Sequence, residues 1–131
     1  MKAFNENILK IHNAMNLDLG YQNIGSSKLL GISGTVKLIE YNIKNIDEWT
    51  KERPVHSNLM VGTANCKIIP EPYGCSLVIG SWNYPFYTTI SPAIEAISAG
   101  NCVCLKPSEL SPNCSNLIKE LFEKYMDSSC Y

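Results

Sequence analysis

The stretch Glu71–Glu109 reads EPYGCSLVIGSWNYPFYTTISPAIEAISAGNCVCLKPSE, and it decides the fold. It holds an apolar run from Cys75 to Ile79, a helix-like segment that opens at Pro85 and stops at Gly100, and a second apolar run from Cys102 to Leu105. A strand, a helix and a strand within about 30 residues predict two parallel strands joined by a right-handed crossover. The expected fold class is therefore α/β.

Two helices are expected upstream of this unit. An apolar stripe in steps of three and four predicts a helix over residues 5–18 that stops at Gly20. A longer stripe predicts a helix over residues 27–51, capped by Ser26 or Ser27 and ended before Pro54. This second stripe consists of Leu29, Ile32, Val36, Ile39, Ile43, Ile46 and Trp49. Packing on its own domain is the favoured role, and a dimer seam is the alternative.

The remaining segments complete a division into three parts. Residues 1–58 are expected to form helices and a linker, residues 59–74 an outlying β segment with a strand at 63–70, and residues 75–131 a partial cofactor-binding domain. Pro92 predicts a late start or a kink in the crossover helix. A final helix is expected over residues 112–126, capped by Ser111, and the letters SSCY after Asp127 begin another segment.

Composition excludes several classes of partner. The chain has 131 residues and a net charge of -1, with 11 basic residues scattered among 12 acidic ones, which argues against nucleic-acid binding. No apolar run approaches the ~20 residues of a membrane span. The N-terminus lacks a cleavage signal, so a cytoplasmic location is expected. His12 lies off the first stripe and is expected to face solvent.

Six cysteines occur without any CxxC pair, at positions 66, 75, 102, 104, 114 and 130. Because no export signal is present, a structural disulfide is not expected. Strand alternation places Cys102 and Cys104 on one face, where packing is the favoured role, and no metal site is expected.

Polar side chains follow both strands, so they should meet at the sheet edge where open α/β folds bind ligands. Lys106 offers donors to phosphate or ribose oxygens and Glu109 could accept from a ribose diol, although a solvated ion pair is an equal alternative. Asn83 offers an amide NH2 of the kind that stabilises oxyanions. Its alternative is an Asx turn before Tyr84. The GxGxxG fingerprint of dinucleotide-binding loops is absent.

The segments EPYGCSLVIGSWNYPF and AISAGNCVCLKPSEL resemble the N-terminal cofactor-domain portion of the aldehyde dehydrogenase superfamily. WNYPF with KPSEL is similar to the class 3 branch, as are NLDLG and IKNIDEWTKERPV upstream. The resemblance covers nearly the whole chain. It implies an incomplete aldehyde dehydrogenase fold, in which N-terminal helices precede the first βαβα portion of a Rossmann-like parallel sheet.

The resemblance implies oxidation of an aldehyde to a carboxylic acid with NAD or NADP, by a thiolate nucleophile and a glutamate-activated water. By position, Asn83 is similar to the oxyanion-stabilising asparagine and Tyr84 to an aromatic residue at the substrate entrance. The residues similar to cofactor-binding positions are Ile79, Gly80, Ser81, Trp82, Lys106 and Glu109. A homodimer is implied for the full-length family member.

Later family motifs have no counterpart in the sequence. The GxTxxG turn, the glutamate of an ELGGK-like segment and the nucleophile of a GQxC-like segment are absent from the 131 residues. The expectation is an N-terminal fragment, truncated before the catalytic cysteine and inactive alone. The alternatives are a noncatalytic assembly module that pairs with a full-length relative and an isolated nucleotide-binding domain.

Overall fold

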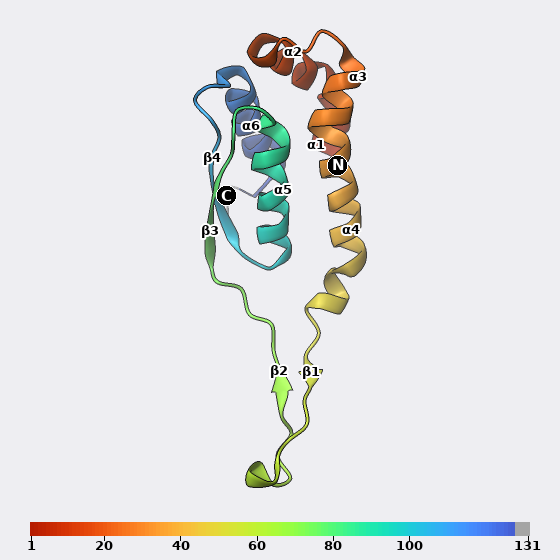
Figure 1. The fold of residues 1–131 in the computed structure, drawn as a ribbon, viewed down its shortest axis with the longest axis vertical. Coiled ribbons are helices and arrows are strands. Elements are labelled where there is room, and N and C mark those ends of the chain that lie inside the picture. The colour runs from red at the N-terminus through yellow and green to blue at the C-terminus, as the bar shows by residue number, and fades with distance from the viewer. Residues whose placement is uncertain (128–131) are drawn as a thin grey trace.

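The computed structural model describes residues 1–127, apart from the side chains at positions 29 and 30. The expected SSCY segment and the stripe position Leu29 lie outside this description. A two-stranded sheet, a pair of helices beside it and a third helical layer make up the body, and a thin arm extends from one end (Figure 1). Within residues 1–127 no helix is long and apolar enough to cross a bilayer.

The first expected helix is two helices, α1 (Lys2–Glu6) and α2 (Ile8–Leu19). The break is at Asn7, whose amide Nδ2 donates to the Ala3 carbonyl at 2.8 Å and to the Tyr125 hydroxyl at 3.1 Å. These side-chain bonds compete with regular helix bonding and tie the break to the C-terminal helix. Gly20 ends α2 in the left-handed conformation at φ 70°, which confirms the predicted stop.

The long helix is confirmed but begins earlier than expected. It runs through α3 (Ile24–Ser27), a π-helical stretch (Lys28–Ser33) and α4 (Gly34–Trp49). Asn23 caps it, accepting from the Gly25 amide at 2.7 Å, so the prediction of Ser26 or Ser27 as the cap is wrong. Ser27 is instead buried and lies 2.9 Å from Nδ1 of His12. His12 is therefore partly buried, not solvent-facing as predicted.

Burial is uneven along the described part of the predicted apolar stripe, residues 32–49. Ile32 is 5% exposed, whereas Ile43 is 67% exposed. The lower half of α4 instead borders a cleft of about 640 Å³ beside the end of the crossover helix. Gly31 allows the π-helical stretch to lie close to α2, because an added Cβ would lie 2.7 Å from Sδ of Met15.

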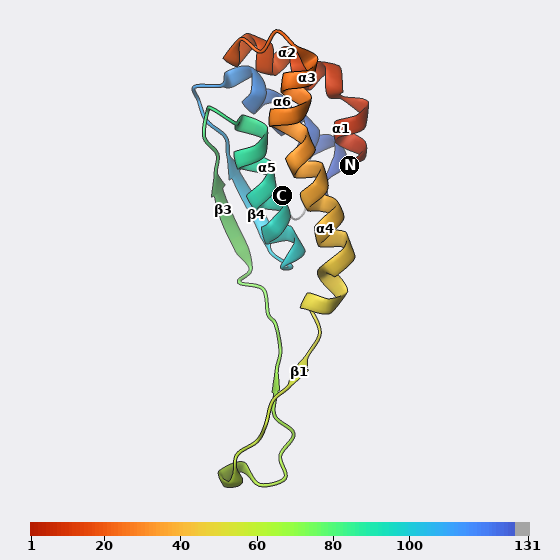
Figure 2. The same cartoon turned by 45° about the vertical axis from the view of Figure 1, so that its right-hand side comes forward.

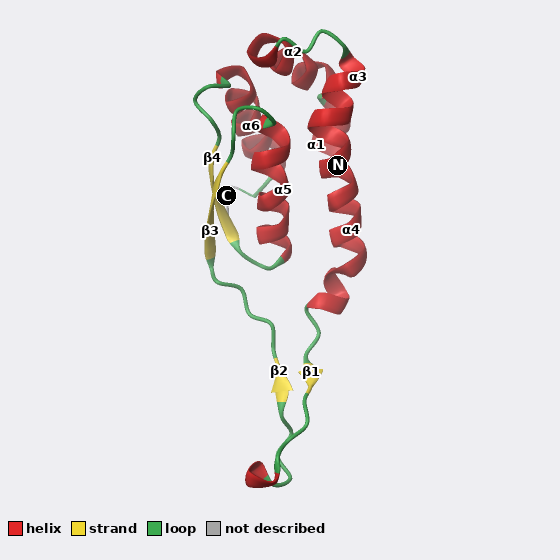
Figure 3. Cartoon of the chain, viewed as in Figure 1, coloured by secondary structure: helices red, strands yellow, loops and turns green. Residues whose placement is uncertain are grey.

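The arm is a short antiparallel ribbon of β1 (Arg53–Pro54) and β2 (Lys67–Ile68), with a 3-10 turn (Leu59–Val61) at its tip (Figure 3). The expected strand over residues 63–70 is thus much shorter, and part of the expected linker pairs with it. Proline residues limit the ladder because they lack an N–H donor.

The central unit is confirmed as a parallel pair, β3 (Cys75–Ile79) and β4 (Cys102–Lys106), joined by α5 (Pro85–Ser98). The helix continues through Pro92, whose side chain is exposed, so the predicted late start is wrong. Both α5 and α6 (Pro112–Tyr125) lie on the same face of the sheet (Figure 2). Val78 and Val103 pack there against Ala93.

The other face of the sheet is open within residues 1–127. Leu77 is 64% exposed and Ile79 is 68% exposed, with Cys75 and Cys104 beside them. Register places Cys102 and Cys104 on one face, as predicted. Cys104 is exposed, however, so its predicted packing role is wrong, because no second layer covers this face in the described chain.

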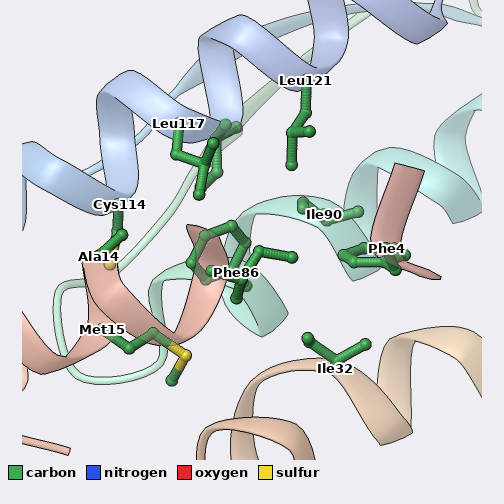
Figure 4. Packing of buried hydrophobic residues seen from close by; sticks show 11 residues of the cluster. Phe4, Ala14, Met15, Ile32, Phe86, Ile90, Cys114, Leu117 and Leu121 are labelled. Carbon is green, nitrogen blue, oxygen red and sulfur yellow. The ribbon is translucent and has the colours of Figure 1, made fainter. Parts of the chain in front are cut away.

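The main core lies between the helices (Figure 4). Phe86 of α5 is fully buried in this cluster, which also includes apolar side chains from α1, α2, the π-helical stretch and α6. The other buried members of the cluster are Phe4, Ile11, Ala14, Met15, Ile32, Ile90, Cys114, Leu117, Ile118 and Leu121. The N-terminal helices therefore share one core with the βαβα unit.

The start of α6 is capped from outside its own segment. Ser111 is the N-cap residue and Pro112 follows it, as predicted, but the Ser111 side chain makes no cap hydrogen bond. The Asp18 carboxylate accepts from the Asn113 backbone at 3.2 Å and the Cys114 backbone at 2.7 Å. A carboxylate at this place satisfies two free N–H groups and suits the helix dipole.

Candidate functional site

The two polar segments meet at one edge of the parallel sheet. The Gly80 amide donates to the Lys106 carbonyl at 3.0 Å, directly after the ladder pair of Ile79 with Lys106. Residues 81–84 and 106–109 therefore begin at the same level of the sheet. This is the edge where the sequence predicts a ligand site.

The elbow after β3 is held by a hydroxyl that sequence reasoning missed. Thr88 Oγ1 accepts from the Ser81 amide at 3.0 Å and donates to the Tyr84 carbonyl at 2.9 Å. The second bond is the i to i−4 pattern typical of threonine in a first helical turn, so the position of Thr88 after Pro85 was an available signal. Thr88 thus fixes the elbow against the start of α5.

Asn83 is exposed on this elbow, and its Oδ1 accepts from the Ser81 hydroxyl at 2.8 Å. Among residues 1–127, no backbone N–H bonds to that oxygen, so the alternative of an Asx turn is wrong. The same described hydrogen bonds leave the Asn83 NH2 without an acceptor. A free amide donor therefore stands at the carboxyl end of β3, next to the exposed rings of Trp82 and Tyr84.

Lys106 and Glu109 form an ion pair through Nζ and Oε2. Lys106 Nζ also lies 3.2 Å from the Pro107 carbonyl. The hydrogen bond from Lys106 holds the pKa of Glu109 below its usual range. The two side chains are 53% and 77% exposed, so they form the solvated ion pair that was one of the two alternatives expected from the sequence. The pair also lies at the sheet edge where the other alternative, a ligand site, is expected.

Gly80 makes the close junction between β3 and α5. An added Cβ would lie 2.0 Å from Oγ1 of Thr89, which is buried and lacks a hydrogen-bond partner within residues 1–127. No side chain fits here without movement. Only glycine therefore allows the strand end and the first turn of α5 to approach this closely.

The family profile described as "Aldehyde dehydrogenase family" matches residues 1–127. The chain belongs to the aldehyde dehydrogenase family. It is 39% identical over 128 residues to "Aldehyde dehydrogenase family 3 member B3" of Mus musculus, covering 96% of this chain and 26% of that protein. It is 46% identical over 93 residues to "Aldehyde dehydrogenase, dimeric NADP-preferring" of Canis lupus familiaris, covering 71% of this chain and 20% of that protein.

Solved aldehyde dehydrogenases share the fold. A substrate-bound structure of Staphylococcus aureus AldH superposes with a TM-score of 0.92 at 36% identity, covering 98% of this chain and 28% of that one. A Streptococcus pyogenes succinic semialdehyde dehydrogenase in complex with NADP+ superposes with a TM-score of 0.73 at 18% identity. The class 3 resemblance and the incomplete α/β fold are thereby confirmed. The chain spans about a quarter of the length of these aldehyde dehydrogenases.

The side chains at the edge fit a nicotinamide dinucleotide in chemical type. The Lys106 ammonium can donate hydrogen bonds to phosphate or ribose oxygens. The Glu109 carboxylate can accept hydrogen bonds from ribose hydroxyls. The backbone at Gly80 carries no Cβ, and Ile79 presents an exposed apolar surface beside it. Within residues 1–127, no group of His, Cys, Asp and Glu could hold a metal ion.

Proposed function

We propose that this aldehyde dehydrogenase segment supplies the cofactor side and the oxyanion amide of a site that oxidises aldehydes to carboxylic acids with NAD or NADP. Family membership supports the reaction class. The observation that carries the residue assignment is the Gly80 to Lys106 hydrogen bond, which brings the Asn83 elbow and the Lys106–Glu109 pair to one sheet edge.

The cofactor would be held by the ends of both strands. When bound, NAD(P) accepts a hydride from the substrate. Lys106 and Glu109 would bind the adenosine ribose, exchanging their exposed ion pair for contacts to it. Residues 79–82 would lie along the bound cofactor, and Tyr84 would lie at the substrate entrance.

Asn83 would act on the aldehyde oxygen. Its NH2 group donates a hydrogen bond to the negative charge that develops there when the carbonyl is attacked. The bond from the Ser81 hydroxyl to Oδ1 holds the amide with its donor side outward, which reduces the reorganisation needed during the reaction. Ser81 would thus be a positioning residue for Asn83.

Neither the nucleophile nor the general base would come from these 131 residues, because the sequence lacks the motifs that carry them. Cys114, which is buried, is unsuited to attack. Its burial, followed by its hydrogen bond to the Asp18 carboxylate, raises the pKa of the thiol far above its usual range. The chain alone is therefore expected to be inactive.

A chimera tests the proposed function. The corresponding segment of Staphylococcus aureus AldH, which shares the fold at a TM-score of 0.92, is replaced by this chain, and NAD(P)H formation from an aldehyde is measured. The chimera is expected to be active, and the 131-residue chain alone is expected to form no NAD(P)H. A folded chimera that turns over normally after Asn83→Ala would refute the assignment.

The open sheet face favours a second candidate, a noncatalytic module that assembles with a full-length relative. Leu77 and Ile79 are 64% and 68% exposed on this face. Size-exclusion chromatography of the chain with and without the Staphylococcus aureus enzyme tests for a complex. Unchanged elution of both proteins would eliminate this candidate.

A further inference from the structure

Two cysteines begin the two strands of the parallel sheet side by side. Cys75 is the first residue of β3, Cys102 is the first residue of β4, and the two are Cα partners. The Cys102 amide donates to the Gly74 carbonyl at 2.8 Å, and the Gly74 amide donates to Asn101 Oδ1 at 2.9 Å. These bonds hold the strand starts together next to the cysteine pair.

Both side chains are on the open face of the sheet. Within residues 1–127, Cys75 is exposed and Cys102 is partly exposed, so small solutes reach Cys75 in this chain. Neighbouring strands lie about 4.8 Å apart, which is within the Cα separation of about 4.4 to 6.8 Å that a disulfide accepts. The two cysteines are therefore paired in register and lie on the same face of the sheet, and both conditions permit a bond between their sulfur atoms.

The neighbouring cysteine on the same face does not meet these conditions. Cys104 is exposed, but its Cα partner is Leu77. Residues two apart on one strand are separated by about 6.6 Å with parallel side chains, too far for the Cβ spacing of about 3.8 Å in a disulfide. Cys104 is thus a matched control, with the same face and the same strand but no facing thiol.

We propose that Cys75 and Cys102 are a redox-sensitive modification site, oxidised reversibly by hydrogen peroxide to a disulfide that joins the starts of β3 and β4. One thiolate attacks a peroxide oxygen, the O–O bond breaks, and a sulfenic acid and water form. The second thiolate attacks the sulfenic sulfur, the S–S bond forms, and the hydroxyl leaves as water after protonation. Two thiols and one peroxide give one disulfide and two waters.

The bond is expected to be easily reduced. Facing Cβ atoms on parallel strands are separated by about the strand spacing of 4.8 Å, wider than the relaxed disulfide value of about 3.8 Å. Closing this gap strains the strand starts, and strained disulfides have more oxidising potentials. The site lies at the end of the sheet opposite the Asn83 elbow, so the modification does not depend on the proposed function.

The test is peroxide oxidation of the reduced, folded 131-residue chain, followed by alkylation and mass spectrometry without reduction. No Lys or Arg lies between Lys67 and Lys106, so cleavage after aromatic residues is needed to separate Cys75 from Cys102. The expected product has lost two hydrogens, links the peptides that contain these cysteines, and returns to the reduced mass with dithiothreitol.

Two single variants decide the pairing. Cys104→Ser is expected to keep the linked product, and Cys75→Ser is expected to abolish it. Circular dichroism shows whether Cys75→Ser is folded. If it is not, the peptide map of the oxidised wild-type chain still identifies which cysteines are linked. The proposal is overturned if Cys75 remains alkylatable while Cys104 is oxidised, or if Cys102 links to Cys104, Cys130 or any other cysteine. Loss of the product in Cys104→Ser would also overturn it.

Discussion

The backbone amide of Gly80 donates a 3.0 Å hydrogen bond to the carbonyl oxygen of Lys106. This bond extends the β3 and β4 ladder by one step beyond its last Cα pair, Ile79 with Lys106. The elbow that bears Asn83 and the loop that bears Glu109 consequently start from a shared, rigid point. Their juxtaposition is a property of the sheet and not of the loops.

Gly80→Ala is expected to destabilise the chain by about 1–3 kcal/mol, because the new methyl group overpacks the junction with α5. The added Cβ would lie 2.0 Å from Thr89 Oγ1 and 3.1 Å from Thr89 Cβ. Urea unfolding followed by circular dichroism measures the loss. Thr89→Ala removes the closer atom, so the double variant is expected to recover part of it. A Gly80→Ala chain with unchanged stability would contradict the close approach.

Asp18→Ala is expected to cost about 1 kcal/mol at neutral pH, because α6 loses its cap. Asp18→Asn, which retains an acceptor oxygen, is expected to cost less. Equal stability of wild type and Asp18→Ala in urea at neutral pH would show that the cap contributes nothing.

The Asp18 contribution is expected to depend on pH. Partial burial raises the pKa of this carboxyl, but hydrogen bonds from Cys114 and Asn113 lower it more, so the folded-state pKa lies below its usual value. The stabilisation is then complete above the unfolded pKa of about 3.9 and is lost as pH falls through the folded pKa. The stability difference between wild type and Asp18→Asn should therefore shrink on acidification below about pH 4, and a difference that grew instead would contradict this sign.

In the active chimera, Asn83→Ala is expected to lower kcat by about 10²- to 10³-fold, because one oxyanion donor is lost. Ser81→Ala is expected to lower kcat by a smaller factor, since it releases the Asn83 amide without removing it. Asn16→Ala, on an exposed position of α2, is the matched control and should leave kcat unchanged. A larger loss for Ser81→Ala than for Asn83→Ala would contradict the positioning role.

The isolated chain is expected to self-associate through its open sheet face, because uncovered apolar strands and free sheet edges attract further copies. Leu77→Lys places a charge on this face and is expected to shift elution toward the monomer. Leu9→Lys is the matched control, because Leu9 is 65% exposed on α2 and Leu77 is 64% exposed on β3. If the two substitutions change the elution equally, self-association does not occur through the open sheet face.

The strand, helix, strand unit could be predicted because its signals are local. Pro85 opens α5, Gly100 adopts φ 84° two residues after its end, and an apolar run lies on either side. The meeting of the Asn83 and Lys106 segments followed from the rule that parallel strands end at the same edge. Sequence periodicity, however, overestimated the burial of α4, since Ile43 satisfies the stripe but contacts no layer that covers it.

The sequence by itself determined the family, the parallel pairing and the residue types at the candidate edge, because motif order, helical period and strand alternation are properties of neighbouring residues. Only the tertiary structure decided which partners those residues meet. Asp18 caps α6 from another helix, and Cys75 faces Cys102 across the sheet. Each contact joins segments that are far apart in the sequence, and their separation along the chain does not indicate that they meet in space.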